Sequence, residues 1–411
     1  MSAPALRAER AIANSFLPYG RQLIEEDDIA AVTEALRGDL LTTGPYVDRF
    51  EKALAKTVGA NHAVVCSNGT AALHMAARAL NLGVGTKVIV PAITFLATAS
   101  APHMNGAEIV FADVDPETGL MRPEDLEAAF GRAGHADAVF NVHLNGQCGD
   151  LEAIGTVARK HGARVVDDSC HAVGTAYVAE DGTICPIGSN RFADLSVFSF
   201  HPVKTIAMGE GGAVTTNDSD IAERLVRARN HGMTRDPARF ENGKDAFNAD
   251  GTPNPWYYEL IEPEFNWRAN DIQCALGLSQ LNKLGRFVAR RRALAAMYDT
   301  LLAPLASLVR PTARTRPSLP AWHLYAARID FERAGVSRAQ VMHELQKSGI
   351  GSQVHYYPVH RQPYYAKRHG ALPLPGADRY YSRALSLPLF ASMTQSDVER
   401  VVSALGSALG L

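Results

Sequence analysis

Short apolar runs rich in β-branched residues alternate with helical patterns along the first half of the chain, and this alternation restricts the possible folds. The runs are HAVVC, KVIVPA, AEIVFADV, ADAVFNVHL, ARVVDD and LSVFSF, and several are separated by patterns such as PEDLEAAF and LEAIGTVARKHG. Because parallel strands need a long crossover, usually a helix, the alternation predicts an α/β domain with a mostly parallel sheet. The run GGAVTTND follows its predecessor too closely for such a crossover, which predicts an antiparallel strand there.

The C-terminal part predicts a second, smaller domain. A chain of 411 residues is too long for one ordinary domain. Helical spacing continues for about 35 residues from Asn270, long enough to link two domains. WHLYAARID then reads as a strand, and TQSDVERVVSAL as a helix that begins with a T-x-x-D box. We expect a large domain over residues 1–280, interrupted by a polar excursion from Thr234 to Pro255, and an α+β domain over residues 281–411.

Composition excludes several classes of partner. The formal net charge of −2 gives no overall basic surface for nucleic acid or an anionic membrane. No apolar run approaches the roughly 20 residues of a membrane helix, and the N-terminal segment lacks the apolar core of a signal peptide. Five cysteines without a CxxC pair argue against a disulfide framework and a thiolate metal site. We therefore expect a cytoplasmic protein with no metal.

One lysine stands out in the segment SFHPVKTIAMGEGG. Lys204 follows the apolar run LSVFSF and precedes Gly209, Gly211 and Gly212. It could be a solvated cation beside an ordinary glycine-rich turn. Alternatively, the end of the strand delivers an amine into a pocket while the glycines let the backbone approach a ligand. The neighbouring motifs have to decide between these interpretations.

Two further motifs carry groups that complement an amine. SNGTAAL places Gly69 and Thr70 at a predicted helix N-terminus, which suits a phosphate, although an ordinary N-cap would look the same. VVDDSCHAVG places Asp167 and Asp168 at the end of a buried strand, with His171 three residues after Asp168. A buried carboxylate requires a partner, but a strand-end aspartate can also cap the next turn.

Taken together, the three motifs match what pyridoxal phosphate requires. Lys204 would form the Schiff base, and Asp168 would hold the proton on the pyridine nitrogen. The start of the predicted helix at Gly69 would bind the phosphate, to which the Ser199 hydroxyl could donate. Each motif alone is weak, but their combination predicts an enzyme that uses this cofactor.

The same segments, together with PAITFLATA, RNHGMTRD and FNWRANDIQCALGLSQL, resemble the DegT/StrS-type nucleotide-sugar aminotransferases, a fold type I pyridoxal phosphate family. The resemblance covers nearly the whole chain. It implies that Phe95 stacks on the cofactor ring, that His171 lies near its ring hydroxyl, and that Asn266 reaches the neighbouring subunit's cofactor in a homodimer with shared sites. The implied cofactor-binding residues are Gly69, Thr70, Phe95, Asp168, His171, Ser199, Lys204 and Asn266.

A narrower similarity concerns the substrate. PWYYE, HPVK and QVHYYPVHRQPYY are most similar to the branch that aminates C4 of a UDP-4-keto-6-deoxy-N-acetylhexosamine in pseudaminic acid synthesis, with L-glutamate as amino donor. The substrate-binding residues that this implies are Tyr19, Asp39, Leu40, Leu41, Thr42, Val354, His355, Tyr356 and Tyr357. The chain departs from the resemblance at Ala207 and Met208, where relatives often carry threonine, and in the polar loop from Thr234 to Pro255, which is not common to the wider family.

The resemblance implies transamination in two halves, in which Lys204 moves a proton in each half. Other functions stay open from the sequence. A transaminase of another keto sugar, of the perosamine or dTDP-amino-sugar type, would carry the same cofactor motifs. A sugar dehydratase of this fold has histidine in place of the lysine, and Lys204 argues against it. A non-catalytic regulator that binds the cofactor is the third alternative, because fold does not determine function.

Overall fold

The computed structural model describes residues 16–411. The expected start of the large domain at residue 1 lies outside the described residues, as does most of the segment compared above with a signal peptide. A seven-stranded sheet forms the centre, in the order β1-β9-β8-β5-β4-β2-β3. Its strands are β1 (His62–Cys66), β2 (Lys87–Pro91), β3 (Glu108–Ala112), β4 (Ala138–Val142), β5 (Arg164–Asp168), β8 (Leu195–Ser199) and β9 (Gly212–Thr216).

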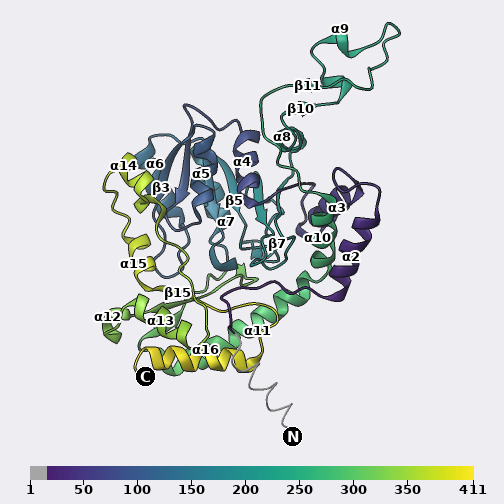
Figure 1. Ribbon diagram of the computed structural model, residues 1–411. Coiled ribbons are helices and arrows are strands. Elements are labelled where there is room, and N and C mark those ends of the chain that lie inside the picture. Colours follow the sequence, from purple (N-terminus) through teal and green to yellow (C-terminus); the bar gives the residue numbers. More distant parts are fainter. Residues whose placement is uncertain (1–15) are drawn as a thin grey trace.

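The direction of the strands agrees with the sequence pattern. The pairs β3–β2, β2–β4, β4–β5 and β5–β8 are parallel, whereas β9 runs antiparallel to both β8 and β1. Helices pack around this sheet, as Figure 1 shows. They are α4 (Gly69–Ala79), α5 (Leu96–Met104), α6 (Pro123–Ala133), α7 (Leu151–Lys160) and α8 (Ser219–Arg229). The expected mostly parallel α/β sheet is therefore confirmed.

Two N-terminal helices, α2 (Glu26–Arg37) and α3 (Pro45–Val58), pack against α10 (Asp271–Asn282). The helical spacing after Asn270 belongs to two helices, because α10 ends before Lys283 and α11 (Leu284–Leu302) begins after it. The ammonium group of Lys283 lies 2.7 Å from carboxylate oxygens of both Asp27 and Asp28. This ion pairing ties the junction between the two helices to α2.

The C-terminal part builds a second sheet from β12 (Val309–Pro311), β14 (Tyr325–Ile329) and β15 (Ala384–Leu387). Helices α11, α13 (Arg338–Lys347) and α16 (Gln395–Ala408) enclose an apolar cluster of their own with it. Thr394 and Asp397 form the expected capping box at the start of α16. Residues between Val359 and Ala384, including part of α15 (Pro375–Arg383), pack into the core of the large sheet instead. The boundary at residue 280 stays a prediction.

Smaller elements complete the described chain. A three-stranded sheet joins β6 (Ala176–Val178), β7 (Ile184–Pro186) and β13 (Ser318–Leu319). Two short helices, α12 (Phe331–Ala334) and α14 (Pro363–His369), lie in the C-terminal part. Among the described residues, no helix combines the length and apolar character that crossing a membrane would require.

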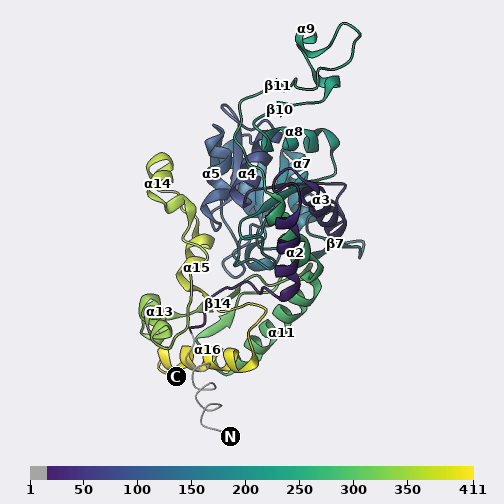
Figure 2. The ribbon, with the colours of Figure 1, turned by 45° about the vertical axis from the view of Figure 1, so that its right-hand side comes forward.

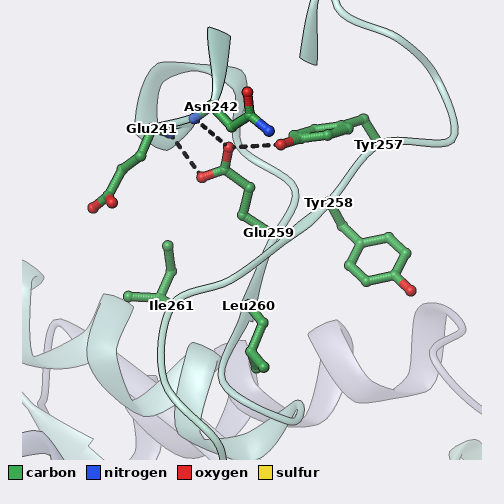
Figure 3. Close-up of a pocket in the computed structure, with 7 residues that line it drawn as sticks. All are labelled: Glu241, Asn242, Tyr257, Tyr258, Glu259, Leu260 and Ile261. Carbon is green, nitrogen blue, oxygen red and sulfur yellow. Dashed lines mark hydrogen bonds between the residues drawn. The ribbon is translucent and has the colours of Figure 1, made fainter. Parts of the chain in front are cut away.

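The polar excursion is an arm that extends away from the body of the molecule (Figures 1 and 2). Its base is the pair β10 (Met233–Thr234) and β11 (Glu259–Leu260), and its tip carries α9 (Gly243–Ala246). A cavity of about 350 Å³ lies in the arm (Figure 3). The Glu259 carboxylate there accepts hydrogen bonds from the N–H groups of Glu241 and Asn242 and from the Tyr257 hydroxyl, at 2.7–2.9 Å. These polar groups are engaged in holding the arm together.

Gly212, the last of the three glycines after Lys204, has a structural role that the sequence interpretation missed. Gly212 pairs with Cys66 on β1 and with Ser199 on β8. A Cβ atom on Gly212 would lie 2.3 Å from the carbonyl oxygen of Asn68 and 2.8 Å from the nitrogen of Gly69. The backbone that approaches this glycine is therefore the first turn of α4.

We predict that Gly212→Ala lowers the free energy of unfolding by about 1–3 kcal/mol, because backbone atoms of α4 cannot move aside as a flexible side chain would. Gly131→Ala in α6 is the matched control, since its Cβ would meet nothing within 4 Å. It should leave stability unchanged or raise it by up to about 1 kcal/mol. Denaturant unfolding measures both variants, and equal stability of the two would contradict the packing argument.

Candidate active site

The candidate site lies at one edge of the central sheet, where several parallel strands end. β1 leads into α4, β5 ends at Asp168 and β8 ends at Ser199. Phe95 follows β2 and is the N-cap of α5. Ligands of open α/β sheets bind outside the carboxyl ends of the strands, so the residues predicted from separate motifs meet where a ligand is expected.

The N-terminus of α4 forms a cradle for an anion. Asn68 caps the helix by accepting a hydrogen bond from the N–H group of Ala71 at 2.8 Å. The described residues supply no acceptor to the N–H groups of Gly69 and Thr70. A Cβ atom on Gly69 would lie 2.9 Å from the Cβ atom of Ser199. Backbone donors and the Ser199 hydroxyl therefore converge on one small space, which suits a phosphate group.

The two neighbouring aspartates have different surroundings. Asp168 is buried, and its carboxylate accepts hydrogen bonds from the Thr98 hydroxyl at 2.6 Å and from the Cys170 N–H group at 3.2 Å. Asp167 is also buried, but it accepts a hydrogen bond from the Asn141 side chain at 3.1 Å. The charge of Asp168, not that of Asp167, acts on Lys204. Which of the two aspartates faces the cofactor stays a prediction.

Lys204 is half-buried in the turn between β8 and β9, five residues beyond the end of β8. The expectation of a strand-end lysine is wrong in this detail, because the chain turns back toward antiparallel β9, and the Lys204 N–H group donates to the His201 carbonyl at 2.8 Å. Burial lowers the pKa of the Lys204 amine, while electrostatic interactions with Cys170 and Asp168 oppose this shift. A lowered pKa increases the fraction of neutral, nucleophilic amine.

A cluster of buried aromatic and imidazole rings faces the lysine. His171 Nε2 lies 3.0 Å from the Tyr356 hydroxyl, and the ring centroids of His171 and His323 lie 4.4 Å apart. Among the described residues, the buried Nδ1 of His171 has no hydrogen-bond partner. Burial, reinforced by Lys204 and His355, holds the pKa of His171 well below its usual value. The imidazole is therefore neutral near pH 7 and has one ring nitrogen to offer to a ligand.

Several predicted substrate residues join this cluster. The Tyr19 ring lies 5.5 Å from the His355 ring, and the Phe95 ring lies 6.0 Å from the Tyr356 ring. Phe95 is 54% exposed, so its ring can accept a stacked ligand. His355 Nδ1 lies 2.8 Å from the Ser386 hydroxyl, and burial lowers the pKa of His355 to about 3.

For the other predicted residues, the structure shows contacts with groups outside this cluster. The exposed segment 39–42 hydrogen-bonds to α10 through the Leu41 carbonyl, which accepts from the Asp271 N–H group at 3.0 Å. Tyr357 contacts Tyr381 at 5.3 Å between ring centroids. Half-buried Val354 donates its N–H group to the side chain of Gln353, and exposed Asn266 accepts from the Arg268 N–H group.

Sequence interpretation missed three residues of the site. Thr98 supports Asp168, Cys170 lies between Asp168 and Gly69, and His323 packs on His171. Thr98 and Cys170 stand in the quoted segments PAITFLATA and VVDDSCHAVG, so both could have been singled out there. His323 stands in the quoted segment WHLYAARID, but that segment indicated only a strand, and only folding brings it to the site.

The residues present fit pyridoxal phosphate. The cradle at Gly69 offers groups for a phosphate, the Lys204 amine suits an aldehyde carbon, and the Asp168 carboxylate suits a protonated ring nitrogen. The unpartnered His171 Nδ1 offers one further polar atom to the ligand. Exposed Phe95 adds an aromatic face.

Comparison with known proteins supports this interpretation. Residues 22–406 match the DegT/DnrJ/EryC1/StrS aminotransferase family. The chain is 40% identical over 394 residues to the spore coat polysaccharide biosynthesis protein SpsC of Bacillus subtilis (strain 168). The matched region covers 95% of this chain and 96% of SpsC.

Solved structures show the same architecture. Helicobacter pylori PseC, an aminotransferase involved in the biosynthesis of pseudoaminic acid, has a TM-score of 0.86 and 28% identity over 96% of this chain and 100% of PseC. Spr1654 from Streptococcus pneumoniae in its PLP form has a TM-score of 0.82 and 26% identity over 96% of this chain and 99% of its own. The expected fold type I architecture is confirmed, and pyridoxal phosphate is the cofactor. The chain belongs to the DegT/DnrJ/EryC1/StrS aminotransferase family.

Proposed function

We propose that this aminotransferase moves an amino group from L-glutamate to C4 of a UDP-4-keto-6-deoxy-N-acetylhexosamine. The observation that carries the reaction type is the meeting of Lys204, Asp168 and the N-terminus of α4 at one sheet edge. The choice of sugar is supported by the similarity to PseC, which acts in pseudoaminic acid biosynthesis. Similarity to SpsC, a polysaccharide biosynthesis protein, agrees with a nucleotide-sugar route.

The cofactor would be held by residues from several elements. Gly69, Thr70 and Ser199 would bind its phosphate, and Phe95 would cover its ring. Asp168 would hold the proton on the ring nitrogen, with the Thr98 hydroxyl and the Cys170 N–H group positioning its carboxylate. When bound, pyridoxal phosphate supplies an electron sink for the carbon that loses its proton.

Lys204 would attach the cofactor covalently and then carry protons. Its amine, with a lowered pKa, can take a proton at Nζ from the α-carbon of the donor. In the second half of the reaction, the same amine would return a proton while the amino group passes to the sugar. His171 would remain neutral throughout, because its pKa is held low by burial.

For the sugar nucleotide, we propose the Tyr19, His355 and Tyr356 group, extended by Val354, Tyr357 and the segment 39–42. The rings of Tyr19 and His355 already lie together, and their polar atoms can hydrogen-bond to a sugar. Leu40 and Leu41 of this segment are exposed and therefore accessible to a ligand.

The proposal includes a homodimer in which Asn266 reaches the partner subunit's cofactor. The exposed position of Asn266 leaves it accessible to a second subunit. It also includes a cytoplasmic location, which the five unpaired cysteines support, because disulfides form and persist in oxidising compartments.

We predict that Lys204→Ala lowers turnover by about 10²–10⁴-fold or more, because 10²–10⁴-fold is the range typical of a lost acid–base group. Borohydride reduction followed by mass spectrometry should attach the cofactor to the parent protein but not to the variant. Lys160→Ala, at an exposed lysine paired with Glu127, is the control and should behave as the parent. Near-normal turnover of Lys204→Ala would refute the proposal.

The two aspartates provide a second test. Asp168→Asn should lower turnover by about 100-fold or more while the fold is retained, since an amide cannot hold the ring proton as a carboxylate does. Asp167→Asn should affect stability more than turnover, because Asp167 hydrogen-bonds to Asn141 on β4. Kinetics and thermal unfolding of both variants decide the matter, and the reverse pattern would shift the site by one residue along β5.

Substrate choice is tested with paired acceptors. Steady-state rates with L-glutamate should favour the UDP-linked 4-keto-6-deoxy-N-acetylhexosamine over a dTDP-linked 4-keto sugar without the acetamido group, by at least about 100-fold in kcat/KM. A site that hydrogen-bonds to an amide leaves its own polar groups unpaired with the second sugar. A preference for the dTDP sugar would instead assign the enzyme to the perosamine or dTDP-amino-sugar type.

A further inference from the structure

A second cavity, of about 240 Å³, lies in the C-terminal part of the chain, and its walls include no residue of the candidate active site. Its walls come from β12, β14, the segment 306–308, helix α12 with its N-cap Asp330, and helix α15, and Glu117 from the loop between β3 and α6 completes them. Five arginines line it: Arg310, Arg328, Arg333, Arg379 and Arg383. Such a concentration of one charge is unexpected in a chain whose formal net charge is −2.

The acidic residues of the cavity are already engaged. Glu117 pairs with Arg328, whose side chain is only 10% exposed. Asp330 caps α12, where its carboxylate accepts a hydrogen bond from the backbone N–H group of Arg333 at 3.1 Å. Five guanidinium groups against these two carboxylates leave a formal excess of three positive charges around a small space. Like charges held together repel one another, and a bound anion would reduce this repulsion.

Arg379 and Arg383 provide the least satisfied donors. They stand four residues apart on α15 and therefore share one side of the helix. Among the described residues, no carboxylate forms an ion pair with either of them. Burial and the charges of Arg383 and Arg379 lower the pKa of Arg328, while Asp115 and Tyr380 oppose this shift. This repulsion is the cost that a bound anion would relieve.

The other two arginines are oriented but not neutralised. Arg310 Nε donates to the Ala306 carbonyl at 3.1 Å, and Arg333 Nη1 donates to the Ser307 carbonyl at 3.3 Å. Each guanidinium carries five N–H donors, so most of these donors remain for a ligand. Backbone carbonyls thus fix the positions of two cations at the cavity without removing their charge.

We propose that this cavity binds the phosphate or diphosphate group of a small soluble ligand, at a site separate from the cofactor and the sugar substrate. Arginine forks match phosphate oxygens in geometry as well as charge. The volume is below the usual 300–1,000 Å³ of sites for larger organic ligands, which suits one or two phosphate groups. The inference does not depend on the identity of the sugar acceptor.

Isothermal titration of the cofactor-loaded enzyme with inorganic pyrophosphate at low salt tests the proposal. The parent should show saturable binding that weakens as salt is raised. Arg379→Gln/Arg383→Gln should weaken it by at least about tenfold while turnover is unchanged. Lys52→Gln/Lys56→Gln is the matched control, because it also removes two exposed cations four residues apart on one helix, α3, outside the cavity.

A parallel titration with UDP distinguishes the source of the phosphate. Equal weakening of pyrophosphate and UDP binding in the arginine variant would show that the diphosphate alone is recognised. If UDP binds to the parent more tightly than pyrophosphate does, and only the arginine variant loses this binding, the ligand is a nucleotide. Absence of saturable pyrophosphate binding to the parent, or equal affinity of parent and arginine variant, would overturn the proposal.

Discussion

The close packing of β9 beneath the first turn of α4 is the constraint on which the candidate site depends. β9 lies between β1 and β8 and runs against both, so the strand that precedes α4 lies two places from the strand that precedes Lys204. Gly212 allows the carbonyl of Asn68 to approach β9 without a side chain in between. The helix N-terminus consequently reaches Ser199, and a phosphate cradle forms from segments far apart in the sequence.

Burial and nearby charges change the pKa values of the amine and imidazole groups that lie together at the site. Burial lowers the pKa of Lys204 and of the histidines around it, which favours neutral nitrogen atoms. Asp168 is the carboxylate that acts on this group, and two hydrogen bonds hold it in place. One supported anion beside a buried amine is an arrangement that suits a cationic ring nitrogen together with a nucleophilic lysine.

Polar residues line both the arm cavity and the arginine cavity, but the two sets of residues differ in how far their charges are compensated. In the arm, the Glu259 carboxylate is fully used by the backbone N–H groups of Glu241 and Asn242 and by the Tyr257 hydroxyl, which makes it a structural group. In the arginine cavity, the charges exceed the partners available among the lining residues. Hydrogen-bond accounting separates the two cases, because the Glu259 carboxylate is satisfied within the arm, whereas the excess of positive charge is the basis of the proposed anion site.

The sequence by itself determined the parallel α/β core, the antiparallel strand after Lys204 and the motifs around Gly69, Asp168 and Lys204. These follow from local periodicity and from the short connection between β8 and β9, which are properties of neighbouring residues. The break at Lys283 could not be read in this way, because its ion pairs run to α2.

Only the tertiary structure decided which side chains meet. It placed His323 on His171, Thr98 on Asp168 and five arginines around one cavity, and it joined the segment 39–42 to α10. Spacing along the chain carries no information about such contacts. They arise when strands and helices distant in sequence pack to bury apolar surface, and each polar group is then satisfied by whatever that packing brings near.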